Sequence, residues 1–335
     1  MIKNNKRRLL TILLVLVIII CYTTGFHRIS SILKSLETQP GESMKKQVAI
    51  ITKSTESAFW KSVFAGANAA GTEYNIMLTI DGPENEEDFE TQNEMLREAA
   101  SAGAEVIVFS AIDYNANAET VDELAKSGIE FVIIDSDVNS DMVSARIGTD
   151  NYMAGKMAAT AALSSIEEEL VIGIVNFDVN SANGQEREEG FRDVVLEDDR
   201  VVEIHTVNVV STTEAAMEGT KELLELYPEI NVIATFNEWT SLGVGYAIEE
   251  LVLEEEISVV AFDSNVASIG MLENGAVDAL IVQNPYAMGY LSVEMAYQLI
   301  NDMEISDTHV DTSTTLITRD NMFDNLSQQV LFSFE

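Results

Sequence analysis

The sequence has 335 residues, of which 47% are hydrophobic, and its formal net charge at pH 7 is -37. This length and apolar content predict a globular protein with room for two lobes, each with its own core, and they exclude a mainly disordered chain. The acidity argues against a nucleic-acid-binding surface, because such a surface would repel phosphate backbones. Neutral or cationic small ligands suit this chain better.

The N-terminal segment has the pattern of a secretion signal. The basic stretch KNNKRR, residues 3–8, precedes the apolar run LLTILLVLVIII, residues 9–20, as in a signal peptide or a signal anchor. Because basic residues stay on the cytoplasmic side, the body of the protein is expected outside the cytoplasm. We expect residues 1–26 to form the signal segment and residues 27–45 to form a tether to the globular part.

Cys21 is the only cysteine of the chain, so no internal disulfide is possible. Its place after the apolar run is similar to that of the lipidated cysteine at the cleavage site of a bacterial lipoprotein. Ile20, however, stands where such a cleavage site needs a small residue. An uncleaved membrane anchor is therefore the preferred interpretation, and lipidation at Cys21 is the alternative.

From Gln47 onward, short apolar runs alternate with longer stretches in which apolar residues recur every three or four positions. Gly71, Gly103 and Gly128 stand where three of the predicted helices should end. Apolar strands separated by helices indicate parallel sheets covered on both faces, which is an α/β fold. The strand candidates, in chain order, are VAIIT, IMLTI, EVIVFSA, FVIID, ARIGTD, LVIGIVNF, NVIATFN, SVVAFD and ALIVQN.

Nine such units are many for one lobe, and the alanine-rich stretch NYMAGKMAATAALSS, residues 151–165, starts a second series of them. We therefore predict two similar doubly wound lobes with parallel sheets. Open α/β sheets bind ligands beyond the carboxyl ends of their strands. The residues that follow the apolar runs are thus the first candidates for a binding site.

Most residues at these strand ends are polar. A carboxylate or amide at a strand end can bind the hydroxyls of a sugar, whereas aromatic rings cover its apolar faces. Phe59 and Trp60 stand in tandem at a helix start, where at least one ring should face a cleft rather than the core. The alternative for any single Asp or Asn is a helix cap. The polar candidates are Lys53, Ser54, Ser57, Asp113, Asp135, Asn237, Asp263 and Gln283.

Seven segments in this order resemble the type I periplasmic sugar-binding proteins of the ribose- and galactose-binding group, the substrate-binding proteins of sugar ABC transporters. The resemblance runs from about Gln47 to Asn321. The segments that carry it are STESAFWKSVFAGANAAG, IEFVIIDSD, IGTDNYMAGKMAA, QEREEGFRD, INVIATFNEWTSLGVGYA, SVVAFDS and ALIVQNPYAMG.

The resemblance implies two lobes joined by three crossings, near Asp150, Gln283 and Asp311, which close around a ligand. Residues 46–149 and 284–311 would form the N-terminal lobe, and residues 150–283 and 312–335 the C-terminal lobe. Phe59 and Trp60 would stack on the sugar ring. The resemblance further implies that its hydroxyls would bind Asp135, Arg187, Asn237, Asp263 and Gln283.

The chain departs from the ribose binders at several positions. Lys53 and Ser57 stand where those proteins carry other polar residues. Ser136 follows Asp135 where they have an arginine, and Ser211 stands near where they supply an aromatic ring from the second lobe. Ribose itself is therefore not the expected ligand. Trp239 offers an alternative stacking face, or else it packs at a helix start.

Other motifs are interpreted as structural. DSDVNSD, residues 135–141, starts like a calcium loop, but its sixth position is Ser140 and its twelfth is Arg146. We expect no metal and no cofactor. The acidic run ENEEDFE, residues 84–90, is interpreted as a solvated helix start. A glycosidase needs a pair of carboxyl groups across a cleft, which Asp135 and Asp263 would supply. A nearby Arg187 would keep them ionised and so handicap a general acid. We therefore do not expect an enzyme.

The leading functional hypothesis is a monomeric, membrane-anchored receptor outside the cytoplasm. It would bind a monosaccharide or similar polyol and deliver it to the permease of an ABC importer. One alternative is a receptor that reports the sugar to a membrane histidine kinase or a chemoreceptor, as in two-component signalling. A remote alternative is a regulator related to the lactose repressor, although the chain starts with an apolar segment and is strongly acidic. We also expect alanine at Trp60 or Asp263 to weaken binding and leave the fold intact.

Overall fold

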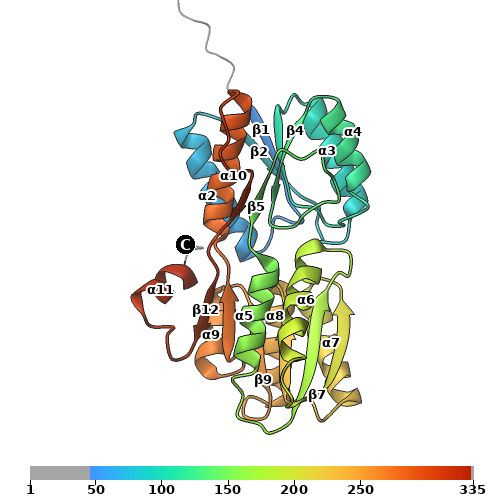
Figure 1. Ribbon diagram of the computed structural model, residues 1–335, viewed down its shortest axis with the longest axis vertical. Coiled ribbons are helices and arrows are strands. Elements are labelled where there is room, and N and C mark those ends of the chain that lie inside the picture. Colours follow the sequence, from blue (N-terminus) through green and yellow to red (C-terminus); the bar gives the residue numbers. More distant parts are fainter. Residues whose placement is uncertain (1–45, 333–335) are drawn as a thin grey trace, which may run out of the picture. The chain divides into compact units, whose positions relative to one another are not determined.

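The computed structural model describes residues 46–332, which fold into two lobes, each built on one six-stranded sheet (Figure 1). The prediction of two α/β lobes is thereby confirmed. No helix within 46–332 combines the length and the apolar character needed to cross a membrane. The predicted anchor, the tether and Cys21 lie outside the described residues.

In the first lobe all six strands are parallel, in the order β11-β5-β4-β3-β1-β2. The last strand of this sheet, β11, comes from far along the chain. The strands are β1 (Gln47–Ile51), β2 (Met77–Asp81), β3 (Val106–Phe109), β4 (Glu130–Ile134), β5 (Ala145–Gly148) and β11 (His309–Asp311). The helices are α2 (Ala58–Glu73), α3 (Phe89–Ser101), α4 (Ala118–Lys126) and α10 (Pro285–Ile300).

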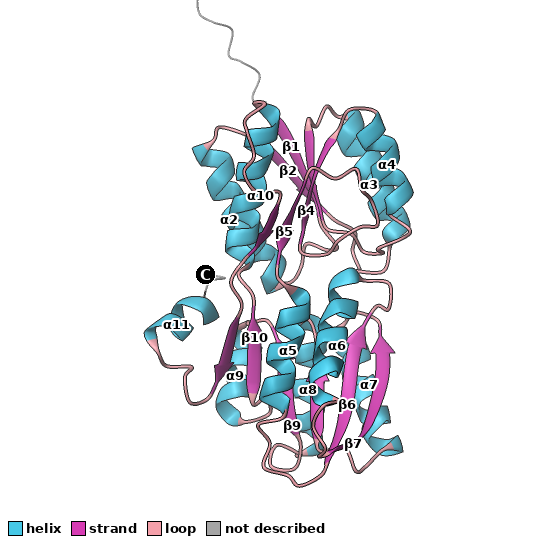
Figure 2. Cartoon of the chain, viewed as in Figure 1, coloured by secondary structure: helices cyan, strands magenta, loops and turns pink. Residues whose placement is uncertain are grey.

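The second lobe repeats this plan, in the order β12-β10-β9-β8-β6-β7 (Figure 2). Its strands are β6 (Leu170–Phe177), β7 (Val201–Val209), β8 (Val232–Thr235), β9 (Ser258–Phe262), β10 (Ala279–Val282) and β12 (Thr315–Thr318). Its helices are α5 (Asn151–Ala162), α6 (Ala182–Val195), α7 (Thr213–Leu226), α8 (Glu238–Leu251), α9 (Val266–Asn274) and α11 (Asn325–Leu331).

The second sheet is not wholly parallel, which corrects the expectation of two parallel sheets. β12 pairs with β10 in the antiparallel direction. The chain leaves the second lobe through β10 and returns to it directly from β11 through residues 312–314. Three residues are too few for a helical crossover, so the returning strand must run opposite to the strand that left.

Helices cover both faces of each sheet. Successive side chains of a strand point to opposite faces, so each strand contributes to both apolar clusters. In β1, Val48 and Ile50 join the apolar cluster under α2 and α10, whereas Ala49 and Ile51 join the cluster under α3 and α4. The second sheet is covered in the same way, by α5 and α6 on one face and by α7, α8 and α9 on the other. This two-sided burial explains the continuous apolar runs in the sequence.

Glycines bring neighbouring helices into close contact. A Cβ atom at Gly66 of α2 would lie 2.0 Å from the carbonyl oxygen of Tyr286, and one at Gly289 of α10 would lie 1.9 Å from that of Val63. In the second lobe a Cβ atom at Gly155 of α5 would lie 2.1 Å from the carbonyl oxygen of Arg187 in α6. The absence of a side chain at these positions therefore sets the helix spacing and, in the second lobe, the position of Arg187.

Two of the three predicted helix-ending glycines behave as expected. Gly103 and Gly128 have positive φ angles, 97° and 104°, directly after α3 and α4. Gly71 does not end its helix, since α2 continues to Glu73 and Gly71 packs against Leu78. The turn after α2 instead uses Asn75, with a φ of 54°, a conformation that Asn adopts more readily than most residues.

Candidate functional site

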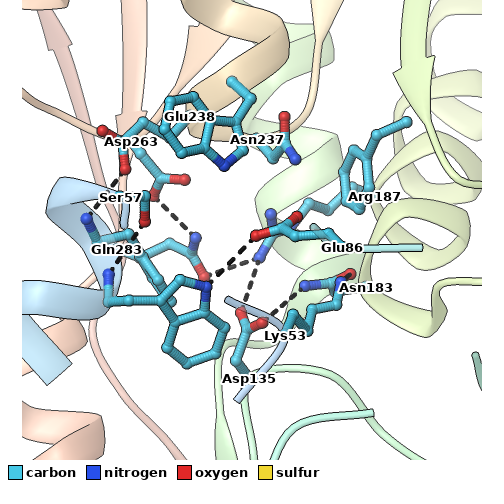
Figure 3. A pocket seen from close by; sticks show the side chains of 14 residues that line it. Lys53, Ser57, Glu86, Asp135, Asn183, Arg187, Asn237, Glu238, Asp263 and Gln283 are labelled. Carbon is cyan, nitrogen blue, oxygen red and sulfur yellow. Dashed lines mark hydrogen bonds and ion pairs between the residues drawn. The ribbon is translucent and has the colours of Figure 1, made fainter. Parts of the chain in front are cut away.

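A cavity between the two lobes brings the strand ends together (Figure 3). Its 14 lining residues surround about 330 Å³ of space not filled by protein atoms, open solvent included. Polar strand-end residues of both lobes meet there, as expected where parallel strands end at one edge. The predicted residues in the lining are Lys53, Ser57, Phe59, Trp60, Asp135, Arg187, Asn237, Trp239, Asp263 and Gln283.

Two aspartates occupy equivalent positions in the two lobes. Asp135 directly follows β4 and Asp263 directly follows β9, and their φ angles are 62° and 65°. This left-handed conformation is uncommon outside glycine but is accessible to Asp. Such outliers gather at binding sites, where the surrounding structure holds them. Both carboxylates line the cavity.

Arg187, on α6, is the centre of the polar network. Its side chain is only 1% exposed, and its guanidinium carries a fixed positive charge into the cavity. Nη2 lies 3.8 Å from a carboxylate oxygen of Asp135 in the other lobe. Its three nitrogens donate hydrogen bonds of 2.7–2.9 Å to the side-chain oxygens of Asn151 and Gln283 and to the carbonyl oxygen of Phe236.

Gln283 lies at a crossing between the lobes and is fixed by its neighbours. Its Oε1 accepts hydrogen bonds from Arg187 and from the hydroxyl of Thr149, at 2.8 and 2.9 Å. Its Nε2 donates to Oδ1 of Asp263 at 2.8 Å. These bonds define the orientation of the amide and connect Arg187 to Asp263.

Lys53 is a buried lysine, 3% exposed, at the carboxyl end of β1. Its ammonium group donates to the hydroxyl of Ser181 at 2.7 Å and contacts Oδ1 of Asn183 at 3.4 Å, both in the second lobe. It also lies 5.2 Å from the centre of the Phe177 ring, within cation–π range. Lys53 therefore bridges the lobes without forming an ion pair in the part of the chain that the structure describes.

The tandem aromatics line the cavity and are also part of the core. Phe59 and Trp60 are 8% and 2% exposed, and their rings meet edge to face with centres 5.1 Å apart. Ser57 caps α2 by accepting the backbone N–H of Trp60. Across the cavity, the second lobe contributes the rings of Phe177 and Trp239.

Carboxylates reach across the lobe boundary in both directions. Glu238 of the second lobe accepts the backbone N–H groups of Ala58 and Phe59 at 3.1 and 2.9 Å. It thereby occupies the positive N-terminal end of α2. In return, Glu86 of the first lobe accepts the hydroxyl of Ser211 at 2.8 Å, and Glu87 accepts its backbone N–H at 2.8 Å.

Four predicted residues lie outside the cavity lining: Ser54, which lines an adjoining cavity, and Asp113, Ser136 and Ser211. Asp113 closes its own turn by accepting the N–H groups of Asn115 and Ala116, so its carboxylate has a local structural role, although Asn117 rather than Asp113 is the N-cap of α4. Ser136 is buried, and its hydroxyl has no hydrogen-bond partner among residues 46–332. Ser211 contacts Glu86, Glu87 and the side-chain amide of Asn237 rather than the cavity.

Four lining residues were not found from the sequence: Glu86, Phe177, Asn183 and Glu238. Phe177 ends the run LVIGIVNF, and Asn183 lies one helical turn before Arg187, so strand-end and helix-spacing signals existed for both. Asn183 donates to Asp135 at 3.0 Å. Glu86 corrects the interpretation of ENEEDFE as a solvated helix start, because it is only 9% exposed and faces the cavity.

Asp263 is buried, which raises the pKa of its carboxyl to about 7. Loss of hydration is the main cause, and the negative charges of Glu238 and Asp135 add to it, whereas Arg187 and Gln283 oppose it. At neutral pH the side chain is therefore divided between the acid and the carboxylate. The acid form can donate a hydrogen bond to a ligand hydroxyl, and the carboxylate can accept one from it.

This raised pKa predicts a measurable pH dependence of stability. The folded protein holds the Asp263 proton up to about pH 7, whereas the unfolded chain releases it near pH 3.8. The folded state thus binds more protons in that interval, and this residue's contribution to the free energy of unfolding falls as the pH rises. Asp263→Asn keeps the shape, tolerates the positive φ and removes this titration.

We therefore expect Asp263→Asn to become more stable relative to the wild type as the pH rises through that interval, up to about pH 7. Urea unfolding of both proteins across the interval measures the difference. Asp113→Asn, outside the cavity, is the matched control and should not show this trend. A constant difference between Asp263→Asn and the wild type would contradict the assignment.

Among residues 46–332, one group of side chains outside the cavity brings together ligand atoms for a metal. Glu203, His205 and Glu229 bring theirs within 4.8 Å of one another, and Nε2 of His205 lies 2.9 Å from a Glu203 oxygen. The imidazole stacks on Tyr227, with ring centres 3.6 Å apart. These residues do not line the cavity, and two carboxylates and one imidazole leave a tetrahedral site one ligand short.

The comparisons with known proteins agree with this geometry. The family model for the periplasmic binding protein domain matches residues 48–304. The ribose import binding protein of Haemophilus influenzae is 20% identical over 282 residues, which cover 82% of this chain and 93% of that protein. A sugar transporter structure from Clostridium phytofermentans is 32% identical, with a TM-score of 0.74, and covers 82% of this chain and 100% of its own.

A second solved structure gives a higher structural similarity. It is a carbohydrate transporter solute-binding protein from Agrobacterium radiobacter in complex with D-arabinose. Its TM-score is 0.84 at 28% identity, and the match covers 87% of this chain and 100% of that one. The similarity spans both lobes and therefore includes the cavity between them.

Proposed function

The chain belongs to the periplasmic binding protein domain family, and we propose that it binds a monosaccharide or similar polyol in the cavity between its lobes, outside the cytoplasm. The resemblance to sugar-binding proteins of ABC transporters, seen in the sequence, is confirmed by the family match and by the relatives. The single observation that supports a sugar is the composition of the cavity, in which planar polar groups alternate with aromatic rings.

A sugar ring needs two kinds of contact. Its hydroxyls bind to carboxylates, amides and guanidinium groups, and its C–H faces pack on aromatic rings. The cavity offers Asp135, Asp263 and Arg187 for the first kind and Phe59 and Trp60 for the second. Burial strengthens each polar contact, because little water remains to compete.

Closure of the lobes follows from contacts that span them. Lys53, Glu86 and Glu238 each contact the opposite lobe. A ligand that touches both lobes stabilises the closed state by the contacts it makes only there. The structure with these contacts formed corresponds to the closed state of such a receptor.

We further propose that the closed protein delivers its ligand to an ABC importer. Supporting this, the relative from Haemophilus influenzae is named an import binding protein, and the Agrobacterium radiobacter structure is named a transporter solute-binding protein. Neither name refers to signalling or to gene regulation. Delivery to an importer is therefore preferred over the kinase, chemoreceptor and repressor alternatives.

The test is a calorimetric and thermal-shift screen of the purified protein against pentoses, hexoses and polyols. We expect at least one of them to raise the melting temperature by mass action. Lys53→Met should weaken its binding by about tenfold to a hundredfold, because the charged hydrogen bonds by which Lys53 holds the two lobes together at the cavity are lost. Lys221→Met is the matched control, since Lys221 pairs with Glu250 away from the cavity, and it should bind as the wild type does.

Two results would sink the proposal. One is that no sugar or polyol binds at millimolar concentration. The other is that a sugar binds equally well to Lys53→Met and to the wild type, which would place its site elsewhere. Uptake of the labelled sugar in cells with and without the protein then decides between import and the alternatives.

A further inference from the structure

The cavity has more negative than positive side chains, and three of its four carboxylates have no basic side chain within ion-pair distance among residues 46–332. Four carboxylates line it, those of Glu86, Asp135, Glu238 and Asp263, against two basic groups, Lys53 and Arg187. The single ion pair among these residues joins Arg187 to Asp135. Burying a carboxylate without a cation is costly unless hydrogen bonds or a ligand compensate.

Glu238 and Asp263 are compensated by the protein itself. Glu238 occupies the N-terminal end of α2 and also accepts from Asn265 at 3.0 Å. Asp263 accepts from Gln283 at 2.8 Å, and because burial raises its pKa to about 7, a proton partly neutralises it at neutral pH. Neither of these carboxylates needs a charge from outside.

Glu86 is different. Its Oε2 accepts one short hydrogen bond, from Ser211 at 2.8 Å. Its Oε1 has only two long contacts, each 3.4 Å, with the indole N–H of Trp60 and the hydroxyl of Ser54. No basic side chain within residues 46–332 lies within ion-pair distance of it. Oε1 is therefore an under-coordinated negative oxygen in the cavity lining (Figure 3).

The basic side chains of the cavity are unable to fill this role, because both are engaged elsewhere. Arg187 donates to three protein oxygens and pairs with Asp135. Lys53 is held by Ser181 and Asn183. A positive charge for Glu86 must come from outside the described chain.

A second cavity adjoins the first at Glu86 and Trp239, and the side chains that line it also carry a net negative charge. It surrounds about 540 Å³, and its lining contains Glu56, Glu84, Glu86 and Glu214 but no Lys, Arg or His. Trp239 forms an aromatic wall shared by the two cavities. A negatively charged cavity concentrates cations and repels anions. An aromatic ring attracts a cation to its face.

We propose that the ligand of this site carries an amino group, as in a 2-amino-2-deoxyhexose, and that Glu86 binds its ammonium. This inference rests on the proposed sugar-binding function and narrows it. The hydroxyls contact Asp135, Arg187 and Asp263, the ring packs on the aromatics, and the ammonium replaces the long contacts of Glu86 Oε1 with a charge-assisted hydrogen bond. Sugar acids and sugar phosphates are excluded by the negative lining.

A neutral sugar hydroxyl would also bind to Glu86, but it would leave the buried charge uncompensated. The two ligand classes therefore differ in what they need from residue 86. An ammonium needs the negative charge, whereas a hydroxyl needs only an acceptor oxygen. Glu86→Gln keeps an acceptor oxygen and the size of the side chain and removes the charge, so it separates the two classes.

The experiment is titration calorimetry of the full-length protein with matched sugar sets. Each set holds a hexose, its 2-amino-2-deoxy form and its N-acetylated amino form, for the gluco, galacto and manno configurations. In one set we expect the amino form to bind at least about tenfold more tightly than the other two, as for a charge-assisted bond. Glu86→Gln should remove most of that difference, because it lowers the affinity for the amino form much more than the affinity for the neutral hexose.

Glu87→Gln is the matched control. Glu87 is adjacent in the chain and contacts the backbone of Ser211, but it does not line the cavity, so its variant should keep the preference. Circular dichroism and the melting temperature confirm that both variants are folded. If a neutral hexose or its N-acetylated form binds as tightly as the amino form, or if Glu86→Gln keeps the preference, the inference is wrong and the sugar-binding function stands. If no sugar of any kind binds, both are wrong.

Discussion

Trp60→Ala is expected to lower the free energy of unfolding by about 3–5 kcal/mol, as for other buried tryptophans. Trp60 is 2% exposed and packs against Phe59 and Phe64, with ring centres at 5.1 and 6.4 Å. Its removal would leave a void under α2 that the neighbouring rings cannot fill. With Trp60 this deeply buried, we now expect the variant to lose stability as well as binding, rather than to keep its fold intact.

Ligand binding should be lost together with this stability, because the same side chain lines the cavity. Denaturant unfolding measures the first effect and calorimetry the second. The other tryptophan of the chain is the control. Trp239 is only half-buried and also lines the cavity, so Trp239→Ala should weaken binding with a much smaller loss of stability. Equal losses of stability in the two variants would show that the described burial is wrong.

Arg187→Ala should destabilise the protein by about 3–5 kcal/mol and abolish binding, as expected when one partner of a buried ion pair is removed. The change leaves Asp135 without its cation and withdraws donors from Gln283 and from the carbonyl oxygen of Phe236. Arg187→Lys keeps the charge but not the planar set of donors. It should recover part of the stability and little of the binding.

Arg192→Ala is the control on the same helix. Arg192 forms a partly buried pair with Glu188 one helical turn away, and pairs at this helical spacing contribute about 0.3–0.5 kcal/mol. Chemical denaturation of the three variants, with calorimetry on each folded one, tests the prediction. If Arg187→Ala were no less stable than Arg192→Ala, Arg187 would not be the centre of the network.

The parts of the site that follow one strand or one helix turn could be predicted from the sequence. Asp135 and Asp263 each stand directly after an apolar run, and the carboxyl end of a parallel strand is a local property of the chain. The two α/β lobes followed from the same alternation of strands and helices. Asp113 shows the limit of this signal, because a strand-end aspartate that closes its own turn looks the same in the sequence.

The parts that depend on the opposite lobe could not be predicted. Glu238 is recognisable only when its carboxylate is seen at the N-terminal end of α2, and these residues are far apart in the chain. Glu86 stands in an acidic run that is typical of a solvated surface, and only its contact with Ser211 reveals that the run is partly buried. Both cases depend on tertiary contacts that no local pattern encodes.

The position of α10 and β11 has a consequence for how the protein assembles. Both belong to the first lobe, yet in the chain they follow all elements of the second lobe except β12 and α11. As the protein emerges from the ribosome, the first lobe therefore lacks its edge strand and the helix that packs on α2 until nearly all of the chain has been made. Contacts of such long sequence separation form late and slowly. The two lobes are thus not independent folding domains, and the nascent chain stays incompletely folded for most of its synthesis.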